Sequence, residues 1–288
     1  MFLFRSLHPI TQFIWFASVI GITMFFIHPV FLAVSLAMSW VYVFLLSGIS
    51  GLLKNFKITF SAGILIIIIN SLVSHNGITV LCFLPDGNAL TAESVIFGCA
   101  AAMLMSASVM WFSCSAGIFT TEKVIYLFGR ISPRLALLIS MTLRFFSKLP
   151  ERFSAVHAAS GVLYRNNVRQ RLRRGMKELS SLIQWALESS ADTADSMSSR
   201  GYGNGKRTFY SDYEFRKTDL FMISAFTAFD IVIITGCISG WADYSYYPFF
   251  DIGIIFVNSA VMFTSFALLC FLPAISEIWE ALMWKYSE

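Results

Sequence analysis

The sequence is poor in charged residues. Only 13% of its 288 residues are Asp, Glu, Lys or Arg, whereas 57% are hydrophobic and the mean hydropathy is +0.69. A water-soluble domain usually carries about a quarter charged residues, so the composition excludes an ordinary soluble domain. Several apolar runs reach the roughly 20 residues that cross a bilayer. We therefore predict an all-α fold, a polytopic membrane helical bundle of about six spans.

The sequence also lacks paired cysteines and clustered histidines. Its five cysteines form no CxxC pair and show no metal-ligand spacing, and most lie in or beside apolar runs, where Cys acts as a small hydrophobe. A membrane-bound enzyme would need His, acidic or Cys side chains gathered at the cytoplasmic face, and no such cluster is apparent. We expect neither catalytic residues nor a metal site. The cysteines are Cys82, Cys99, Cys114, Cys237 and Cys270.

A nucleotide-binding loop is missing as well. The glycine-rich run from Gly201 to Thr208 superficially suggests a phosphate loop, but such a loop has four residues between its glycines and Ser or Thr directly after the Lys. Here Arg207 follows Lys206. The chain therefore has no ATP-hydrolysing motif of its own, and we expect it to bind no cofactor.

The basic residues predict the topology of the apolar runs. With the N-terminus inside, all 21 Lys and Arg residues fall on the cytoplasmic side, and the three outer loops contain none. This predicts a multi-pass plasma-membrane protein with both termini in the cytoplasm. The turn at His28-Pro29 ends the first span and starts the second. The candidate spans are 12–27, 31–46, 58–73, 94–117, 220–240 and 252–272.

A basic segment interrupts the apolar pattern. Residues 144–217 hold 14 of the 21 Lys and Arg residues, which favours a large cytoplasmic insert. We divide the chain into N-terminal transmembrane helices (1–130), a cytoplasmic or interfacial region with two long amphipathic helices (131–217), and C-terminal transmembrane helices (218–288). Ser132-Pro133 is typical of a helix start, and it predicts a short interfacial helix over 131–143. A second helical stretch is expected to run from Pro150 to Gly161.

The longest helix of the insert is predicted over 170–199 and is amphipathic. Its acidic residues Glu188, Asp192 and Asp195 fall opposite its apolar face. A helix divided in this way lies on a surface or along another helix. Ser199-Arg200-Gly201 ends it, with a basic residue in the last turn and Gly at the left-handed cap position. The apolar face, within about 80° of arc, comprises Leu172, Met176, Leu179, Ile183 and Leu187, with Ala194 and Met197 beyond.

Four stretches together resemble a known family. They are Leu7-His8-Pro9-Ile10-Thr11, the run from Asn76 to Ser94, the run from Ser132 to Glu151, and the run from Ala194 to Gly203. The chain is similar over nearly its full length to the T components of energy-coupling factor (ECF) transporters, the CbiQ-like family. This resemblance implies an ATP-driven importer of a vitamin or a metal ion such as cobalt, in which this chain is the transmembrane coupling subunit.

The resemblance also implies partners. Two ATP-binding cassette subunits, which carry ATP and Mg²⁺, would engage the X-Arg-Gly motif at Ser199, Arg200 and Gly201 and its counterpart at Ala159, Ser160 and Gly161. The second site has Ser160 where the family has Arg, so it lacks the forked charge of a guanidinium. We expect an asymmetric grip, with Arg165 as a compensating cation. A membrane-embedded substrate-binding subunit would dock on the apolar face defined above, and no nucleic acid is expected to bind.

Asp230 leaves an alternative open. It lies in the middle of an otherwise uncharged run, and an ionisable group at that depth is a functional candidate. The simpler interpretation is a carboxyl group buried against polar neighbours such as Asn70 or Asn258. A stand-alone secondary transporter that uses Asp230 would need repeated halves and more intramembrane polar groups, and neither is apparent.

Overall fold

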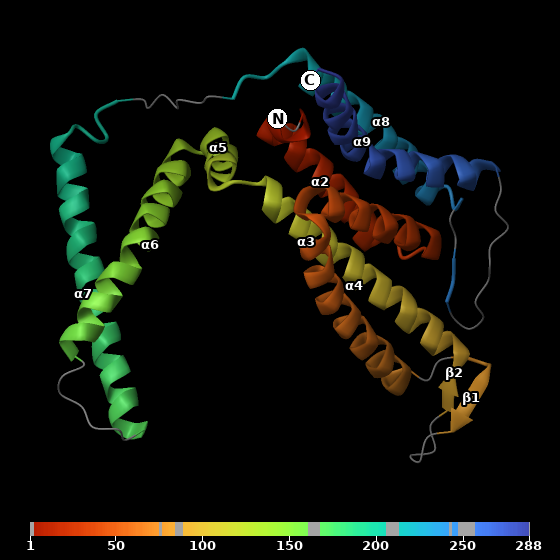
Figure 1. Cartoon of the computed structure of the whole chain (residues 1–288), viewed down its shortest axis with the longest axis horizontal. Coiled ribbons are helices and arrows are strands. Elements are labelled where there is room, and N and C mark those ends of the chain that lie inside the picture. The colour runs from red at the N-terminus through yellow and green to blue at the C-terminus, as the bar shows by residue number, and fades with distance from the viewer. Residues whose placement is uncertain are drawn as a thin grey trace. The chain divides into compact units, whose positions relative to one another are not determined.

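The computed structural model describes residues 3–74, 77–83, 89–160, 168–205, 213–241, 244–246 and 257–287. The chain divides into two compact units, one formed by Met1–Thr121 and Tyr213–Glu288 and the other by Glu122–Asp212. The first unit contains α1 (Leu3–Ser6), α2 (Pro9–Phe25), α3 (Pro29–Val73), β1 (Val80–Phe83), β2 (Ala89–Thr91), α4 (Ala92–Ile118), α8 (Lys217–Ile238) and α9 (Val257–Ser287). The second contains α5 (Thr121–Ile131), α6 (Pro133–Ser160) and α7 (Val168–Ser199) (Figure 1).

The first unit has the helices of a membrane protein. Within the described residues, α3, α4 and α8 are long and apolar enough to cross a bilayer, and two shorter apolar helices accompany them, Pro9–Phe25 and Ser259–Ile275. The predicted helical, membrane-type architecture is confirmed at this level. The prediction of six spans goes beyond what these helices show.

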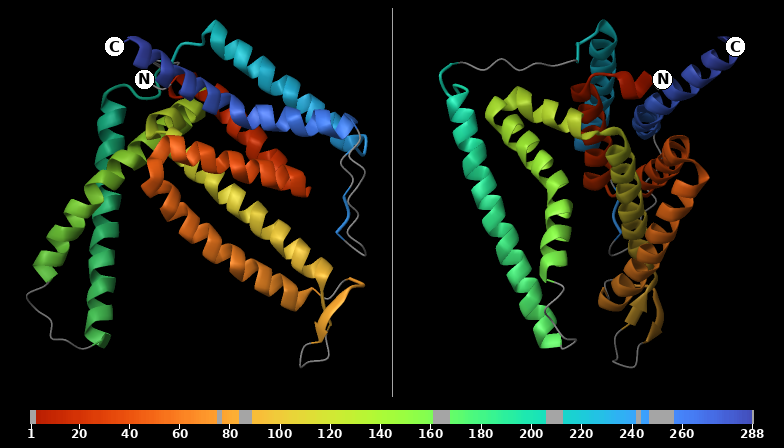
Figure 2. Two further views of the ribbon diagram at one scale, coloured as in Figure 1. Left: turned by 45° about the vertical axis from the view of Figure 1, so that its right-hand side comes forward. Right: turned by 60° about the vertical axis from the view of Figure 1, so that its left-hand side comes forward.

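Two predicted spans, 31–46 and 58–73, fall within the single element α3. Its 45 residues would extend about 68 Å if straight, roughly twice the thickness of the hydrocarbon core. Gly48 interrupts the helix with φ +67° and ψ −168°, a conformation that L side chains avoid. The two arms of α3 therefore run in different directions from Gly48, as both views in Figure 2 show.

The first two long helices begin in the same way. His8 precedes Pro9 at the start of α2, and His28 precedes Pro29 at the start of α3. In each case the ring Nδ1 accepts the backbone N–H two residues later, at 3.2 Å, while proline occupies a position that needs no N–H donor. The predicted break and restart at His28-Pro29 is confirmed.

Aromatic side chains from three helices form the centre of the first unit. Trp15 on α2, Tyr42 on α3 and Trp111 on α4 are almost fully buried, and the rings of Trp15 and Trp111 meet edge to face at 5.4 Å. Both indole N–H groups are satisfied: Trp15 donates to the carbonyl oxygen of Leu269 and Trp111 to Ser35 Oγ, each at 2.9 Å. These bonds position α9 and α3 around α2 and α4.

A β-hairpin occupies the loop between α3 and α4, an element that the all-α prediction does not include. Val80 pairs with Thr91 in an antiparallel register, and the Ala92 N–H donates to the Thr79 carbonyl at 2.9 Å. Glu93, buried in the first turn of α4, accepts hydrogen bonds from the Thr79 backbone and hydroxyl. The hairpin thus places residues 79–83 beside residues 89–93.

The helix boundaries in the second unit differ from those predicted from the sequence. The sequence suggested a short helix over 131–143 and another after Pro150, but α6 is continuous from Pro133 to Ser160 with Pro150 inside it. Its start at Ser132-Pro133 is as predicted. Pro150 removes one backbone hydrogen bond, but side chains on both sides of it pack against Trp185 of α7: Phe145 stacks on the indole at 5.0 Å, and the Arg152 guanidinium lies 5.6 Å from it. These contacts hold α6 against α7 on both sides of Pro150. Helix α5 was not anticipated.

Candidate functional site

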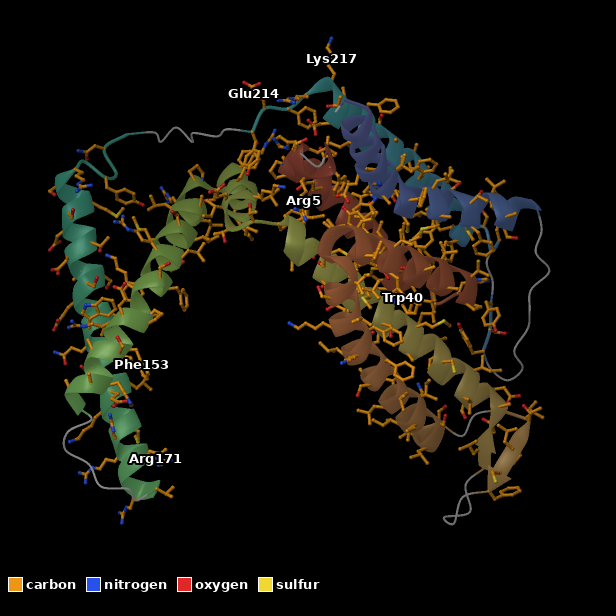
Figure 3. The ribbon with its side chains drawn as sticks, in the orientation of Figure 1. Arg5, Trp40, Phe153, Arg171, Glu214 and Lys217 are labelled. Atoms are coloured by element: carbon orange, nitrogen blue, oxygen red, sulfur yellow. The ribbon has the colours of Figure 1, made fainter. Side chains whose placement is uncertain are left out.

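An apolar groove runs between α6 and α7 in the second unit. It has a volume of about 510 Å³. Helix α6 contributes Phe145, Leu149, Pro150 and Phe153, and α7 contributes Leu179, Leu182, Ile183 and Ala186. Figure 3 labels Phe153 on α6 beside α7. Apolar side chains that line an open groove in this way form a surface suited to an apolar partner.

The predicted docking face on α7 is exposed in the structure. Its five side chains have between 53% and 70% of their surface accessible, and two of them, Leu179 and Ile183, line the groove. Leu172 and Met176 continue the face toward the start of α7, and Leu187 toward its end. An exposed stripe of this length on one helix is uncommon for a surface that has no partner.

A polar cluster fixes the register of α6 on α7 at one end of the groove. Glu178 is buried and accepts from Arg174 Nε at 2.8 Å, and His157 Nδ1 of α6 lies 3.2 Å from the same carboxylate oxygen. Arg174 also donates to the His157 carbonyl at 3.0 Å. The i,i+4 spacing of Arg174 and Glu178 is visible in the sequence, but their contact with His157 depends on the fold and was missed.

The end of α7 has the geometry predicted from Ser199-Arg200-Gly201. Gly201 adopts φ +82°, its N–H donates to the Ser198 carbonyl at 2.9 Å, and the Tyr202 N–H donates to the Met197 carbonyl at 3.0 Å. These two bonds form a Schellman motif, which satisfies the carbonyls of the last turn. The side chain of Arg200, immediately before the left-handed glycine, is exposed. The predicted Gly201 cap is confirmed.

The second predicted ATPase-binding position lies at the other end of the helix pair. The pairing of Phe145 with Trp185 and of His157 with Arg174 shows that α6 and α7 are antiparallel. Ala159 is exposed in the last turn of α6, which contacts α7 at Arg174. From Arg174 to Arg200, α7 extends about 39 Å at about 1.5 Å per residue. Ser160 is the last residue of α6, and Gly161 and Arg165 lie outside the described residues.

Asp230 of α8 is bonded to Ser18 of α2. The Ser18 hydroxyl donates to Asp230 Oδ2 at 2.6 Å, so the partner of Asp230 among the described side chains is Ser18 and not the Asn70 considered from the sequence. The side chain of Asn258, the other candidate, lies outside the described part of the chain. Oδ1 is buried and has no hydrogen-bond partner among the described residues. Both side chains line a second groove, of about 480 Å³, whose other walls are apolar or small: Ala17, Gly21, Ile22, Phe25, Phe26 and Ile234.

In the part of the chain that the structure describes, no three His, Cys, Asp or Glu side chains are placed to hold a metal ion. Comparison with known proteins adds no identification: no protein-family description matches the chain, and no curated protein matches it.

Proposed function

We propose that the chain is the transmembrane coupling subunit of an ATP-driven importer of the energy-coupling factor type, carrying a vitamin or a metal ion. The observation that carries the proposal is the α6–α7 pair: two antiparallel helices with an exposed apolar groove between them and an exposed arginine on a glycine-capped tip. The pair would transmit the closure of two ATPases at its ends to a substrate-binding membrane subunit seated on its apolar face.

The stiffness of the helix pair supports this role. Motion at one end of a helix reaches the other only if the helix stays intact, and α7 has 32 residues with a Schellman motif at its end. The stacking of Phe145 on Trp185 and the contacts among Arg174, Glu178 and His157 join it to α6 at two levels. The two proposed ATPase sites then lie at opposite ends of one rigid pair.

The two ends are chemically unequal. Arg200 offers a guanidinium that can make paired hydrogen bonds to a carboxylate, whereas Ser160 offers a single hydroxyl. We propose that the ATPase at the Ser160 end is held less firmly, and that Arg165 supplies a cation there. Assembly of the complex should therefore weaken in Arg165→Ala, and an unchanged assembly would remove this compensation.

The proposed topology places six spans in the first unit, with the two arms of α3 counted separately. The predicted outer loops contain no Lys or Arg, which is the charge distribution that the positive-inside rule favours. Single cysteines introduced at position 28 and at position 200 would test this topology. The measurement is whether a membrane-impermeant reagent labels each of them. The reagent should label position 28 from outside and position 200 only after the membrane is opened.

The decisive experiment is Arg200→Glu in a chain co-expressed with candidate ATPase subunits. Reversal of this charge should prevent co-purification of the ATPases or abolish ATP-driven uptake, while membrane insertion is retained. Arg130→Glu, the same change at an exposed position on α5, is the matched control and should assemble normally. Full uptake by the Arg200 variant would argue strongly against the proposed role.

A stand-alone secondary transporter is the second candidate, favoured by one observation: Asp230 Oδ1 is buried beside a groove and has no donor among the residues that the structure describes. An uptake assay with the purified chain alone in liposomes, under a proton gradient, distinguishes the two functions. Uptake that is lost in Asp230→Asn would identify a carrier. A coupling subunit should show no uptake alone, and Asp230→Asn should leave ATP-driven uptake by the full complex largely intact.

A further inference from the structure

The first three turns of α7 combine apolar and basic side chains on one exposed surface. Val168, Leu172 and Met176 have 85%, 70% and 66% of their surface accessible. At about 100° per residue these three side chains fall within about 80° of arc. They form the first part of the exposed stripe that continues along α7.

Arginines flank this part of the stripe on both sides. By the same helical geometry, Arg169 and Arg173 lie along one edge of the apolar arc and Arg171 along the other. All three are exposed, and Figure 3 shows Arg171 at the beginning of α7. The opposite side of the helix faces α6, since Arg174 and Glu178 there contact His157.

This charge distribution is unfavourable for an isolated helix. The N-terminus of a helix carries a partial positive charge, which favours acidic residues and disfavours cations. The first turn of α7 has no acidic residue and begins a series of arginines. An external anion that contacts Arg169, Arg171 and Arg173 would therefore stabilise the start of α7.

We infer that the first three turns of α7 bind the surface of a membrane that contains anionic phospholipid. Val168, Leu172 and Met176 insert at the boundary between headgroups and acyl chains, and the arginines extend from the two edges of the stripe to lipid phosphates. An apolar stripe flanked on both sides by long cationic side chains is the pattern of helices that lie in the membrane interface. This inference does not rest on the proposed function.

The charges also limit the extent of the lipid contact. Beyond Met176 the stripe continues through Leu179, Ile183 and Leu187, but its neighbours there are uncharged, such as Ser180 and Gln184. Attraction between basic side chains and an anionic surface decays within a Debye length, about 8 Å at physiological salt. The lipid contact is therefore confined to the start of α7, where it takes Leu172 and Met176 from the proposed docking face. The rest of that face, with the groove between α6 and α7, stays available to another partner.

Hydrogen exchange of the full chain in lipid nanodiscs tests the inference. Backbone amides of residues 168–178 should exchange more slowly, on the order of tenfold, in discs that contain phosphatidylglycerol than in discs of phosphatidylcholine alone. High salt should remove the difference, because the contact is largely electrostatic. Equal exchange in the two kinds of disc would overturn the inference.

The triple variant R169Q/R171Q/R173Q should lose the lipid-dependent protection. Its matched control is R134Q/R144Q/K148Q, which removes three exposed cations from α6 and should keep the protection. Unchanged exchange near the end of α7, at residues 190–199, would show that the triple variant is still folded there. Equal loss in both variants would overturn the inference, because net charge alone would then explain it. Protection that appears only when an ATPase subunit is added would also overturn it, by identifying an acidic protein surface as the partner.

Discussion

Asp219 of α8 accepts a hydrogen bond from the backbone N–H of His8, which immediately precedes α2, at 2.9 Å. The same oxygen, Oδ1, accepts from the Thr11 hydroxyl at 3.3 Å, and Oδ2 accepts from the Arg216 N–H at 3.0 Å. Only 2% of the surface of Asp219 is accessible. One carboxylate thus satisfies donors at the starts of two helices that are more than 200 residues apart in the chain.

Asp219→Ala should destabilise the first unit by about 2–4 kcal/mol, because the buried N–H of His8 and the partly buried N–H of Arg216 lose their acceptor. Thermal unfolding of the purified chain in detergent would measure the change. Asp195→Ala, at an exposed position on α7, should alter stability by less than about 0.5 kcal/mol. Equal effects of the two substitutions would contradict the role assigned to Asp219.

His28→Asn should reduce the pH dependence of stability. Burial lowers the pKa of His28, which lies between α2 and α3, so the folded protein favours the neutral ring whose Nδ1 accepts the Val30 N–H. The stability that depends on this neutral ring is fully present above the ordinary value of 6.5 and is lost as the pH falls through the lowered value. Asn is also a good N-cap but does not titrate.

The measurement is the unfolding midpoint of both proteins as the pH is lowered from about 7.5, which lies above the ordinary pKa of histidine. The wild-type midpoint should decrease more steeply than that of His28→Asn. Parallel curves would show that other groups account for the acid sensitivity. The comparison between variants is needed because all other ionisable groups are common to both proteins.

Gly201→Ala should destabilise the end of α7 by about 1 kcal/mol, because a side chain is strained at φ +82°. Gly175→Ala is the matched control within the same helix, where an added Cβ meets nothing within 4 Å and alanine is the better helix former by up to about 1 kcal/mol. Hydrogen exchange over residues 196–202 should accelerate in the first variant and not in the second. Slower exchange at this end in Gly201→Ala would contradict the Schellman assignment.

Glu178→Gln should loosen the contact between the start of α7 and the last turn of α6. The substitution removes the carboxylate that faces both Arg174 and His157, at a cost of about 1–3 kcal/mol. Exchange over residues 150–159 and 168–177 should accelerate together. Glu188→Gln alters an exposed carboxylate that accepts a hydrogen bond from Gln184 at the helix surface, and it should cost less than about 0.5 kcal/mol.

Predictions from local sequence were correct where neighbouring residues determine the structure. The restart at His28-Pro29 and the start of α6 at Pro133 follow from the fixed φ of proline and its missing N–H. The cap at Gly201 follows from the freedom of glycine at positive φ. The exposed stripe on α7 follows from helical periodicity, although its partner is a proposal.

Predictions failed where distant residues decide the outcome. The predicted separation between the helix over 131–143 and the helical stretch after Pro150 does not occur. Helix α6 is continuous, and Trp185 of α7 packs against both Phe145 and Arg152 of α6. The hairpin was missed because its short strands are stabilised by pairing and by Glu93, and neither contact is a local property of Val80–Phe83. Likewise, the sequence suggests that Asp230 is important without showing that Ser18 is its partner.

The amino-acid sequence by itself determined the apolar, helical character of this chain, its basic insert and the starts and caps of several helices, because these depend on composition and on residues within one or two helical turns. Only the tertiary structure decided that Asp219 accepts hydrogen bonds at two helix starts, that α6 runs through Pro150, and that α6 and α7 form an open apolar groove. Those features depend on contacts between residues far apart in the chain, whose energies are expressed only once the helices have packed.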